Sequence, residues 1–409
     1  MQSSDTARAS PILARGVRMS TLQAAPAVQA HDRVEMLDLL RLLAVLAVLL
    51  FHYGFRGAAA DGLTSASLPA LEPIAKYGYL GVQMFFVISG FVIAYSANGR
   101  TAVTFAIARI ARIYPGFLLC MSLTFLVTLA LGAPRFETTI WQWLANIVVV
   151  APALKQPFMD GAYWSIVYEI TFYGWIYALL LAGWLRRRIG AIVLVWLALS
   201  LMNELVLGSG LLRRLLLTDE SGFFAAGLLL YEMYAGRRGQ TIQILFVASI
   251  FCSVAQALIG LAWLRGHFEA SFDNTVVAVL CVAAIAAVAL AIRVRSIPLP
   301  SGIVLAIGGL TYPLYLLHQH IGYIALNHAR GLAAPAILIA AVMLVMIVLS
   351  WAIWRYFERP SQRFTKALLS GSARQLGLRI GPPPASRSPA AKLPPPAGSP
   401  GKAAIGLAG

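Results

Sequence analysis

The stretch that decides the fold is "LDLLRLLAVLAVLLFHYGFRG", residues 37–57. It is apolar enough to cross a bilayer as a helix, yet it contains Asp38, Arg41 and His52. His52 follows Arg41 by eleven positions, or about three helical turns, so both side chains are expected on one face, roughly 16 Å apart. Asp38 precedes Arg41 by three positions, lies on the same side and can neutralise it. Ionisable groups at such positions usually line a functional cavity, and the alternative is that they reach the interface by snorkelling.

The composition indicates a membrane protein. Of the 409 residues, 59% are hydrophobic and only 12% are charged, which is more apolar surface than a soluble domain of this size can bury. We therefore predict an all-α, polytopic integral membrane protein with about ten transmembrane helices. The expected spans are 36–54, 79–97, 114–132, 163–184, 189–207, 221–235, 241–263, 274–292, 303–327 and 336–357. An eleventh run, 140–153, is too short to span comfortably and is interpreted as interfacial or re-entrant.

The distribution of charge orients this arrangement. With ten spans, the positive-inside rule places most loop arginines and both termini in the cytoplasm. The net charge of +16 lies in short loops and tails rather than on one folded face, which argues against nucleic acid as a partner. We predict a disordered cytoplasmic tail over 1–34, a membrane domain over 35–365, and a disordered, Pro- and Ala-rich cytoplasmic tail over 366–409. Met1 and Met19 are both candidate starts.

Three cysteines and several polar residues fall inside apolar runs. Cys120, Cys252 and Cys281 have no metal-ligand spacing, so they are interpreted as packing residues and no metal site is predicted. Glu169 and His318 fall in the outer halves of their spans, where they are expected to meet His52 around one outward-facing pocket. Two roles are open for Glu169: it orients an imidazole, or it forms a structural hydrogen bond between helices.

Further residues with a possible function, two of them glycines, lie close to the cytoplasmic ends of spans. Arg109 and Arg112 precede the third span, where ordinary positive-inside arginines are common. Gly308 and Gly309 open the ninth span and allow either a close backbone approach or tight helix packing. Glu358 and Arg359 are interpreted as an ion-pair lock at the cytoplasmic end of the last span.

Six motifs, in order along residues 35–365, resemble the acyltransferase 3 family, the integral-membrane O-acyltransferases of bacterial surface glycans and some antibiotics. In the first, an arginine and a histidine are separated by ten residues, as Arg41 and His52 are here. The others are "GYLGVQMFFVISGFVIAYS" (79–96), "FAIARIARIYP" (105–115), "YWSIVYEITFY" (163–173), "GGLTYPLYLLHQ" (308–319) and "WRYFERP" (354–360).

The resemblance implies roles for these residues. An alcohol needs a base to remove its proton as it attacks, and the resemblance gives that role to His52. It implies that Arg41 is essential, either along the path of the acyl donor or in helix packing.

The resemblance also implies acyl-coenzyme A as the donor substrate, with Arg109 and Arg112 as partners of its phosphates, and no permanently bound cofactor. The predicted substrate pocket comprises Tyr163, Trp164, Ser165, Tyr173 and His318; His320 is expected to face elsewhere on the same helix.

The expected function is that of a multi-pass O-acyltransferase of the bacterial inner membrane, most simply an O-acetyltransferase. It would move an acyl group from cytoplasmic acyl-coenzyme A to a hydroxyl on the periplasmic side. The acceptor stays open among lipopolysaccharide, exopolysaccharide, another glycan, a lipid-linked saccharide and other hydroxylated molecules. The alternatives are a transporter or flippase for a lipid-linked sugar or exopolysaccharide precursor, and a structural subunit of an export assembly.

Overall fold

The computed structural model describes residues 34–381, which form helices and no strand. Within these residues, eight helical segments are long and apolar enough to cross a membrane, or nine if a bent pair counts as one span. The prediction of an all-α, multi-pass membrane protein is therefore confirmed.

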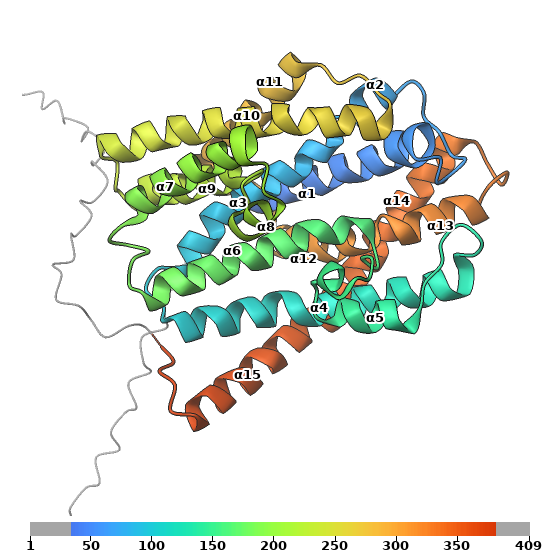
Figure 1. Ribbon diagram of the computed structural model, residues 1–409. Helices are drawn as coiled ribbons and strands as arrows, with labels where there is room; N and C mark the ends of the chain where they lie inside the picture. Colours follow the sequence, from blue (N-terminus) through green and yellow to red (C-terminus); the bar gives the residue numbers. More distant parts are fainter. Residues whose placement is uncertain (1–33, 382–409) are drawn as a thin grey trace, which may run out of the picture. The chain divides into compact units, whose positions relative to one another are not determined.

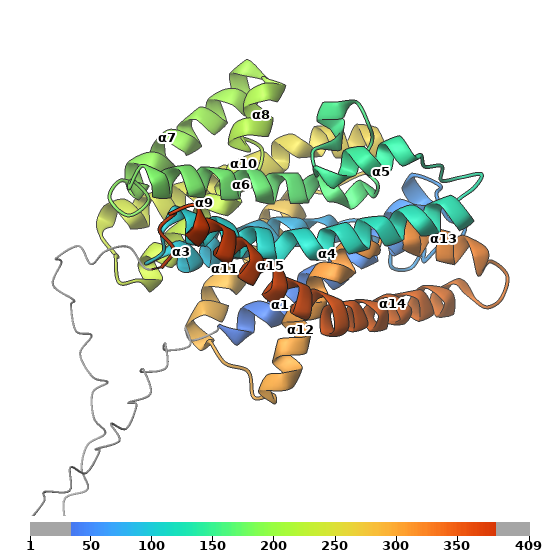
Figure 2. The same ribbon diagram turned by 90° about the horizontal axis from the view of Figure 1, so that it is seen from below.

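Figures 1 and 2 show the long helices side by side. They are α1 (Glu35–Phe51), α3 (Gly81–Ala97), α4 (Ala102–Leu131), α6 (Trp164–Leu181), α7 (Ile189–Met202, continued by a π-helical turn to Leu207), α10 (Gln240–Phe268), α11 (Asn274–Val294), α12 (Ser301–Leu317), α14 (Pro335–Ala352) and α15 (Arg359–Gln375). The shorter helices are α2 (Glu72–Ala75), α5 (Ile140–Ile147), α8 (Gly210–Leu216), α9 (Ser221–Tyr234) and α13 (His320–His328).

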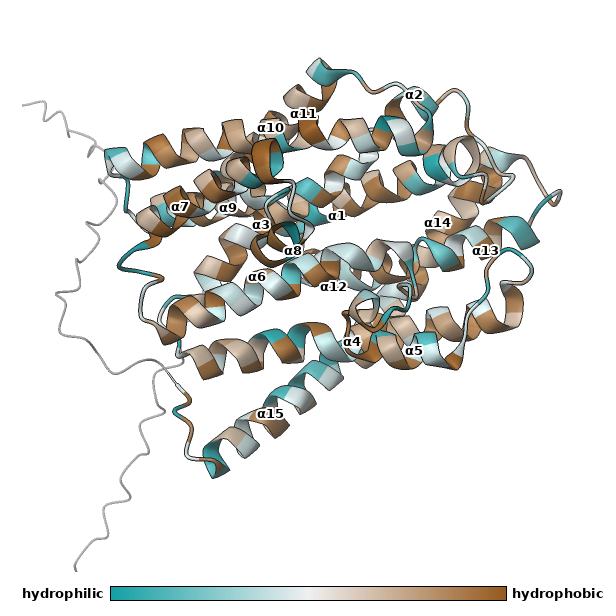
Figure 3. Cartoon of the chain, in the orientation of Figure 1, coloured by the Kyte–Doolittle hydropathy of each residue, from teal (hydrophilic) through white to brown (hydrophobic). Residues whose placement is uncertain are grey.

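The outer surface of these helices is apolar. Figure 3 shows hydrophobic residues along the outer helices, and Phe251 of α10 and Leu344 of α14 are 73% and 62% exposed. Large apolar side chains that face outward on so many helices suit hydrocarbon rather than water. Cys120, Cys252 and Cys281 are free and buried, which confirms them as packing residues.

The predicted span 221–235 is shorter than a bilayer requires. It forms α9, a helix of 14 residues, of which all but the last two are buried. This helix explains why about ten apolar runs become eight or nine helices of spanning length. It packs closely against α3, because Gly90 of α3 and Gly227 of α9 face one another's backbone. A Cβ atom added at Gly90 would lie 2.3 Å from the carbonyl oxygen of Phe224.

Gly90→Ala is therefore expected to destabilise the protein by about 1–3 kcal/mol or more, as overpacking does in tight cores. The collision is with backbone, which cannot rotate away as a side chain can. Thermal unfolding in detergent measures the effect. Gly260→Ala, on α10 with no atom within 4 Å of the added Cβ, is the control and should be neutral or slightly stabilising. Equal melting temperatures for the two variants would contradict the close crossing of α3 and α9.

The predicted span 303–327 is broken. It divides into α12 and α13, which meet at an angle of 72°, so the prediction that His318 and His320 share one helix is wrong. Gly309, in the buried part of α12, makes a close approach: a Cβ atom there would lie 2.0 Å from the Trp354 indole. The run 140–153 forms only α5 and a short 3-10 turn, Ala151–Leu154, as expected for a segment that does not span.

The last predicted span also ends in a different place. A π-helical turn, Ile353–Glu358, joins α14 to α15 in one helical segment of 41 residues, Pro335–Gln375. The helix therefore continues past Glu358, where its end was expected. Residues 366–375, which were predicted to be part of the disordered tail, are helical because they continue α15. Residues 376–381 of this tail are described and not helical, whereas 1–33 and 382–409 lie outside the described residues.

Candidate active site

His52 lies where α1 changes into a π-helical turn, His52–Ala60. Its side chain is buried, with 5% exposure, and its ring packs against the edge of Phe51. π-Helical turns often occur at functional sites, because the wider turn displaces side chains from their regular positions. Here the displaced side chain is directed toward α13.

Tyr323 of α13 orients the His52 imidazole. Its hydroxyl oxygen lies 2.9 Å from His52 Nδ1 and 3.3 Å from the backbone carbonyl oxygen of His52. Both contacts are satisfied when Nδ1–H donates to the tyrosine oxygen and the tyrosine O–H donates to the carbonyl. That arrangement leaves His52 Nε2 unprotonated. Tyr323 was missed in the sequence because it is 271 residues from His52 and sits in no recognised motif.

His318 is the second imidazole at this position. Its ring centroid lies 4.8 Å from that of His52, in an edge-to-face arrangement. His318 Nδ1 is 2.7 Å from the carbonyl oxygen of Tyr315 and so carries the proton. His318 Nε2 is buried and has no hydrogen-bond partner within residues 34–381. The structure therefore brings together two of the predicted residues, His52 and His318, each with Nε2 available as an acceptor.

Asp160 stabilises the break between α12 and α13, where His318 lies. Its side chain is fully buried. One carboxylate oxygen accepts the backbone N–H of Ala162 and the other accepts that of His320, both at 2.8 Å. Asp160 thereby caps the turn that leads into α6 and also the first residue of α13. Asp160 was not singled out in the sequence, because its contact with His320 joins segments 160 positions apart.

Two tyrosine hydroxyls satisfy carbonyl groups that the break leaves without helical partners. Tyr163 donates to the carbonyl oxygen of Leu316 at 3.1 Å, and Tyr53 donates to that of His318. Tyr163, predicted to line the substrate pocket, thus supports the helix break in this structure. His320, as expected, is separate from His52: its ring packs 5.2 Å from that of Phe136.

A cleft lies next to the histidine pair. It is formed by α1, α3, α4, α6 and α12, and its lining residues are Arg41, Val82, Phe85, Phe86, Ser89, Arg112, Ser165, Ile166, Glu169, Thr311, Tyr312 and Tyr315. At one end, Ser165 Oγ lies 2.7 Å from the Tyr315 hydroxyl. The Tyr315 ring is 5.5 Å from the His318 ring, so one aromatic side chain separates the cleft from the histidines.

Both arginines of the cleft are paired with carboxylates. Arg41 donates to Asp38 at 3.0 Å, as the helical spacing predicts. Arg112 forms an ion pair with the fully buried Glu358, and Gln362 donates to the same carboxylate at 2.6 Å. Glu358 was expected to pair with Arg359, but α4 brings Arg112 to it instead.

Glu169 does not contact either histidine. Its carboxylate accepts hydrogen bonds from Tyr173 and, at 3.4 Å, from Ser89. Tyr323, and not Glu169, makes the hydrogen bond that orients the His52 ring. In this structure Glu169 links α3 and α6 through its hydrogen bond with Ser89. A catalytic role for Glu169 stays a prediction. Trp164, from the same motif, packs edge-on against Phe86 and Tyr168 rather than lining the cleft.

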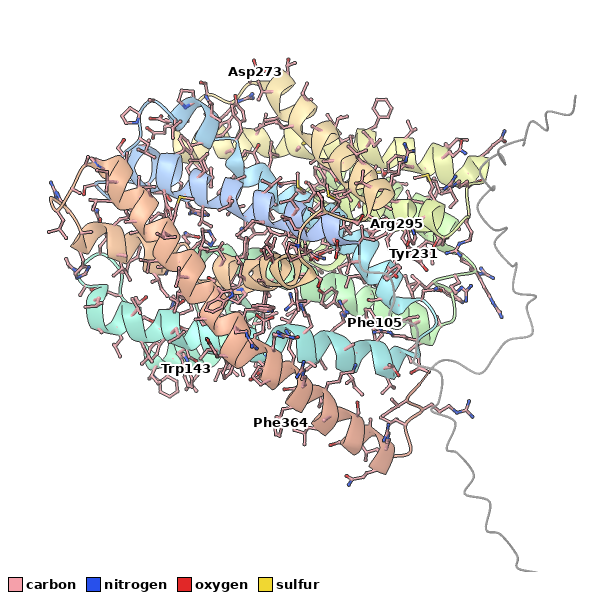
Figure 4. All side chains as sticks on the ribbon, turned by 180° about the vertical axis from the view of Figure 1, so that it is seen from behind. Phe105, Trp143, Tyr231, Asp273, Arg295 and Phe364 are labelled. Carbon is pink, nitrogen blue, oxygen red and sulfur yellow. The ribbon has the colours of Figure 1, made fainter. Side chains whose placement is uncertain are left out.

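The two arginines of the "RIAR" motif face different cavities. Arg112 lines the cleft, whereas Arg109 lines a separate apolar groove between α4 and α6. The Arg109 guanidinium lies 5.8 Å from the ring centres of both Phe105, labelled in Figure 4, and Tyr173. Tyr173 separates the two cavities, because it bonds Glu169 on one side and lines the groove on the other.

The geometry is suited to proton transfer at one end and anion binding at the other. An unprotonated His52 Nε2 can accept a proton from a hydroxyl group, and the neighbouring His318 Nε2 can accept a second hydrogen bond. Arg112 and Arg41 line the cleft with guanidinium groups, which suit phosphate or carboxylate groups. Each is already paired with a carboxylate, and Glu169 lines the same cleft. The arrangement therefore places a candidate base close to a cleft that contains two arginines.

Comparisons with known proteins point to one family. The model of an acyltransferase domain, that of the acyltransferase 3 family, matches residues 34–355. Over 148 residues the chain is 30% identical to the acyltransferase MdmB of Streptomyces mycarofaciens, which covers 34% of this chain and 38% of MdmB. Over 305 residues it is 28% identical to the exopolysaccharide production protein ExoZ of Rhizobium meliloti strain 1021, which covers 71% of this chain and 91% of ExoZ. No solved structure matches.

Proposed function

Because the chain belongs to the acyltransferase 3 family, we propose that it transfers an acyl group from acyl-coenzyme A to a hydroxyl group of a glycan or a related saccharide. The observation that carries this proposal is the pairing of His52 with Tyr323 beside a cleft that contains two arginines. The likeness to a protein named for exopolysaccharide production supports a glycan as acceptor. An acetyl group is the simplest acyl group for this family.

In this mechanism His52 is the general base. Its Nε2 accepts the proton of the acceptor hydroxyl as that oxygen attacks the carbonyl carbon of the thioester. The tetrahedral intermediate then expels the coenzyme A thiolate, which takes the proton back from the imidazolium. One ester and one thiol form from one alcohol and one thioester, and the histidine returns to its starting state. Tyr323 holds the ring in the tautomer that this cycle requires.

The cleft provides the route of the donor. Arg112 binds anionic groups of coenzyme A near the cleft's entrance, and the thin pantetheine arm passes Arg41 toward Tyr315. This places the thioester beside His318 and His52. Positive-inside topology puts Arg112 toward the cytoplasm of a bacterial inner membrane, so donor and acceptor approach from opposite sides.

Sealed membrane vesicles test this directional transfer. Labelled acyl-coenzyme A added to inside-out vesicles, whose outer surface is the cytoplasmic face, should label saccharide in the lumen. Right-side-out vesicles given the same donor from outside should show no transfer. Labelling that requires donor on the periplasmic face would contradict the route through the cleft.

A further inference from the structure

Helix α15 has an apolar outer face that the described part of the chain leaves uncovered. Phe364 and Leu368 are 70% and 56% exposed, and their spacing of four positions places them within about 40° of each other on the helix. Ala367 and Gly371 extend the same stripe at helical spacing. Figure 4 labels Phe364 on this helix. Two large exposed apolar side chains, one turn apart, are unfavourable in water.

A basic stripe runs beside the apolar one. It contains Arg359, Arg363, Lys366 and Arg374, which fall within a sector of about 80° next to Phe364 on the helical wheel. No aspartate or glutamate occurs between residues 359 and 381. The helix is therefore amphipathic in the manner of segments that lie at membrane surfaces, with cations next to an apolar face.

The opposite face of α15 is held against α4, so the orientation of these stripes is fixed. Gln362 donates to the carbonyl oxygen of Arg112 at 3.3 Å, and Ala373 is buried. Two hydrogen bonds of 3.1 Å hold the segment just after α15 against the start of α4. Thr101 donates to the carbonyl oxygen of Arg379, and the backbone N–H of Gly381 donates to Thr104. α15 therefore follows α4 back to its first turn, as Figure 2 shows.

We propose that the outer face of α15 docks on an anionic lipid surface, the cytoplasmic leaflet of the membrane. Phe364 and Leu368 insert among the acyl chains, and the basic stripe binds the phosphate headgroups. Each arginine or lysine close to such a surface contributes about 1 kcal/mol. The docked helix follows directly on Glu358, which pairs with Arg112 of the cleft, and its first turn contains Gln362, which donates to Glu358 and to the Arg112 carbonyl oxygen.

Fluorescence quenching in nanodiscs tests the docking with the full chain. Leu368→Cys places one reactive thiol on the stripe, because the native cysteines are buried. A fluorophore on this thiol should be quenched by spin-labelled lipid in discs that contain phosphatidylglycerol. R363Q/K366Q/R374Q should lower that quenching at least about twofold, since three headgroup contacts are removed.

The control removes the same charge from another exposed loop. R186Q/R187Q/R188Q changes three arginines between α6 and α7 and should leave the quenching unchanged. Size-exclusion profiles and melting temperatures identify variants that fail to fold. Quenching that is absent, or equal in discs of phosphatidylcholine alone, would overturn the proposal. So would energy transfer between labelled copies, which would assign the stripe to a second copy of the chain.

Discussion

His52→Gln is expected to lower the rate of acyl transfer by about 10²–10⁴-fold, the usual contribution of a positioned general base. Glutamine keeps a polar group of similar length, but it cannot accept a proton at neutral pH. The loss should appear in kcat more than in KM for the donor, because His52 lies beyond the cleft that binds coenzyme A in the proposed mechanism. Initial rates in inside-out vesicles, with labelled donor in excess, measure this effect.

Two further variants make the test specific. Tyr323→Phe removes the hydroxyl 2.9 Å from His52 Nδ1 and should cost less than His52→Gln, because the base remains but its tautomer is no longer held. His328→Gln, at the far end of α13, changes a histidine whose Nδ1 contacts only its own helix at Ile324, and it should leave the rate unchanged. Near-normal transfer by His52→Gln would remove this histidine from catalysis.

Asp160→Ala is expected to have the largest effect on stability. It leaves the backbone N–H groups of Ala162 and His320 without their acceptor in a buried site, and each unsatisfied donor costs about 1–3 kcal/mol. The helix break would loosen, so His318 and Tyr323 would no longer be fixed beside His52. Thermal unfolding in detergent, together with the vesicle rate, should show losses in both stability and activity.

Asp273 offers a matched control for this prediction. It is an exposed aspartate that caps α11, accepting the backbone N–H of Val276 at 2.9 Å, and Figure 4 labels it far from α15. Asp273→Ala should cost about 0.5–2 kcal/mol, as the loss of an ordinary cap does, without lowering the rate per folded molecule. Asp160→Asn, which keeps one acceptor oxygen, should fall between wild type and Asp160→Ala. Equal behaviour of the two alanine variants would contradict the special role of Asp160.

Local patterns predicted the helices and one face of α1 well. The length of the apolar runs and the helical spacing of Asp38 and Arg41 depend only on neighbouring residues, so sequence is sufficient for them. The break between α12 and α13 was not predicted, because neither glycine nor proline marks it and its supports come from Asp160, Tyr163 and Tyr53. The bounds of α9 were predicted closely, at 221–235, but its 14 residues are too few to count as a membrane span.

The candidate site was predicted in part for the same reason. His52 and His318 were expected to meet, and they do. Glu169 was expected beside them, but its hydrogen bonds lie with Ser89 and Tyr173, and Tyr323 takes the orienting position instead. Arg109 and Arg112 were treated as one donor-binding pair. Three positions along a helix differ by about 60° in direction, which here is enough to turn the two guanidinium groups into different cavities.

The most direct test of acyl transfer by His52 is the ester content of the cell's surface glycan. Ester-linked acyl groups can be compared by NMR, before and after mild alkali, in cells that carry the wild-type gene, His52→Ala or no gene. The account predicts that a defined O-acyl signal is lost both in the null strain and in His52→Ala, although the variant protein is still inserted in the membrane. Loss of the signal in the null strain with full rescue by His52→Ala would contradict it.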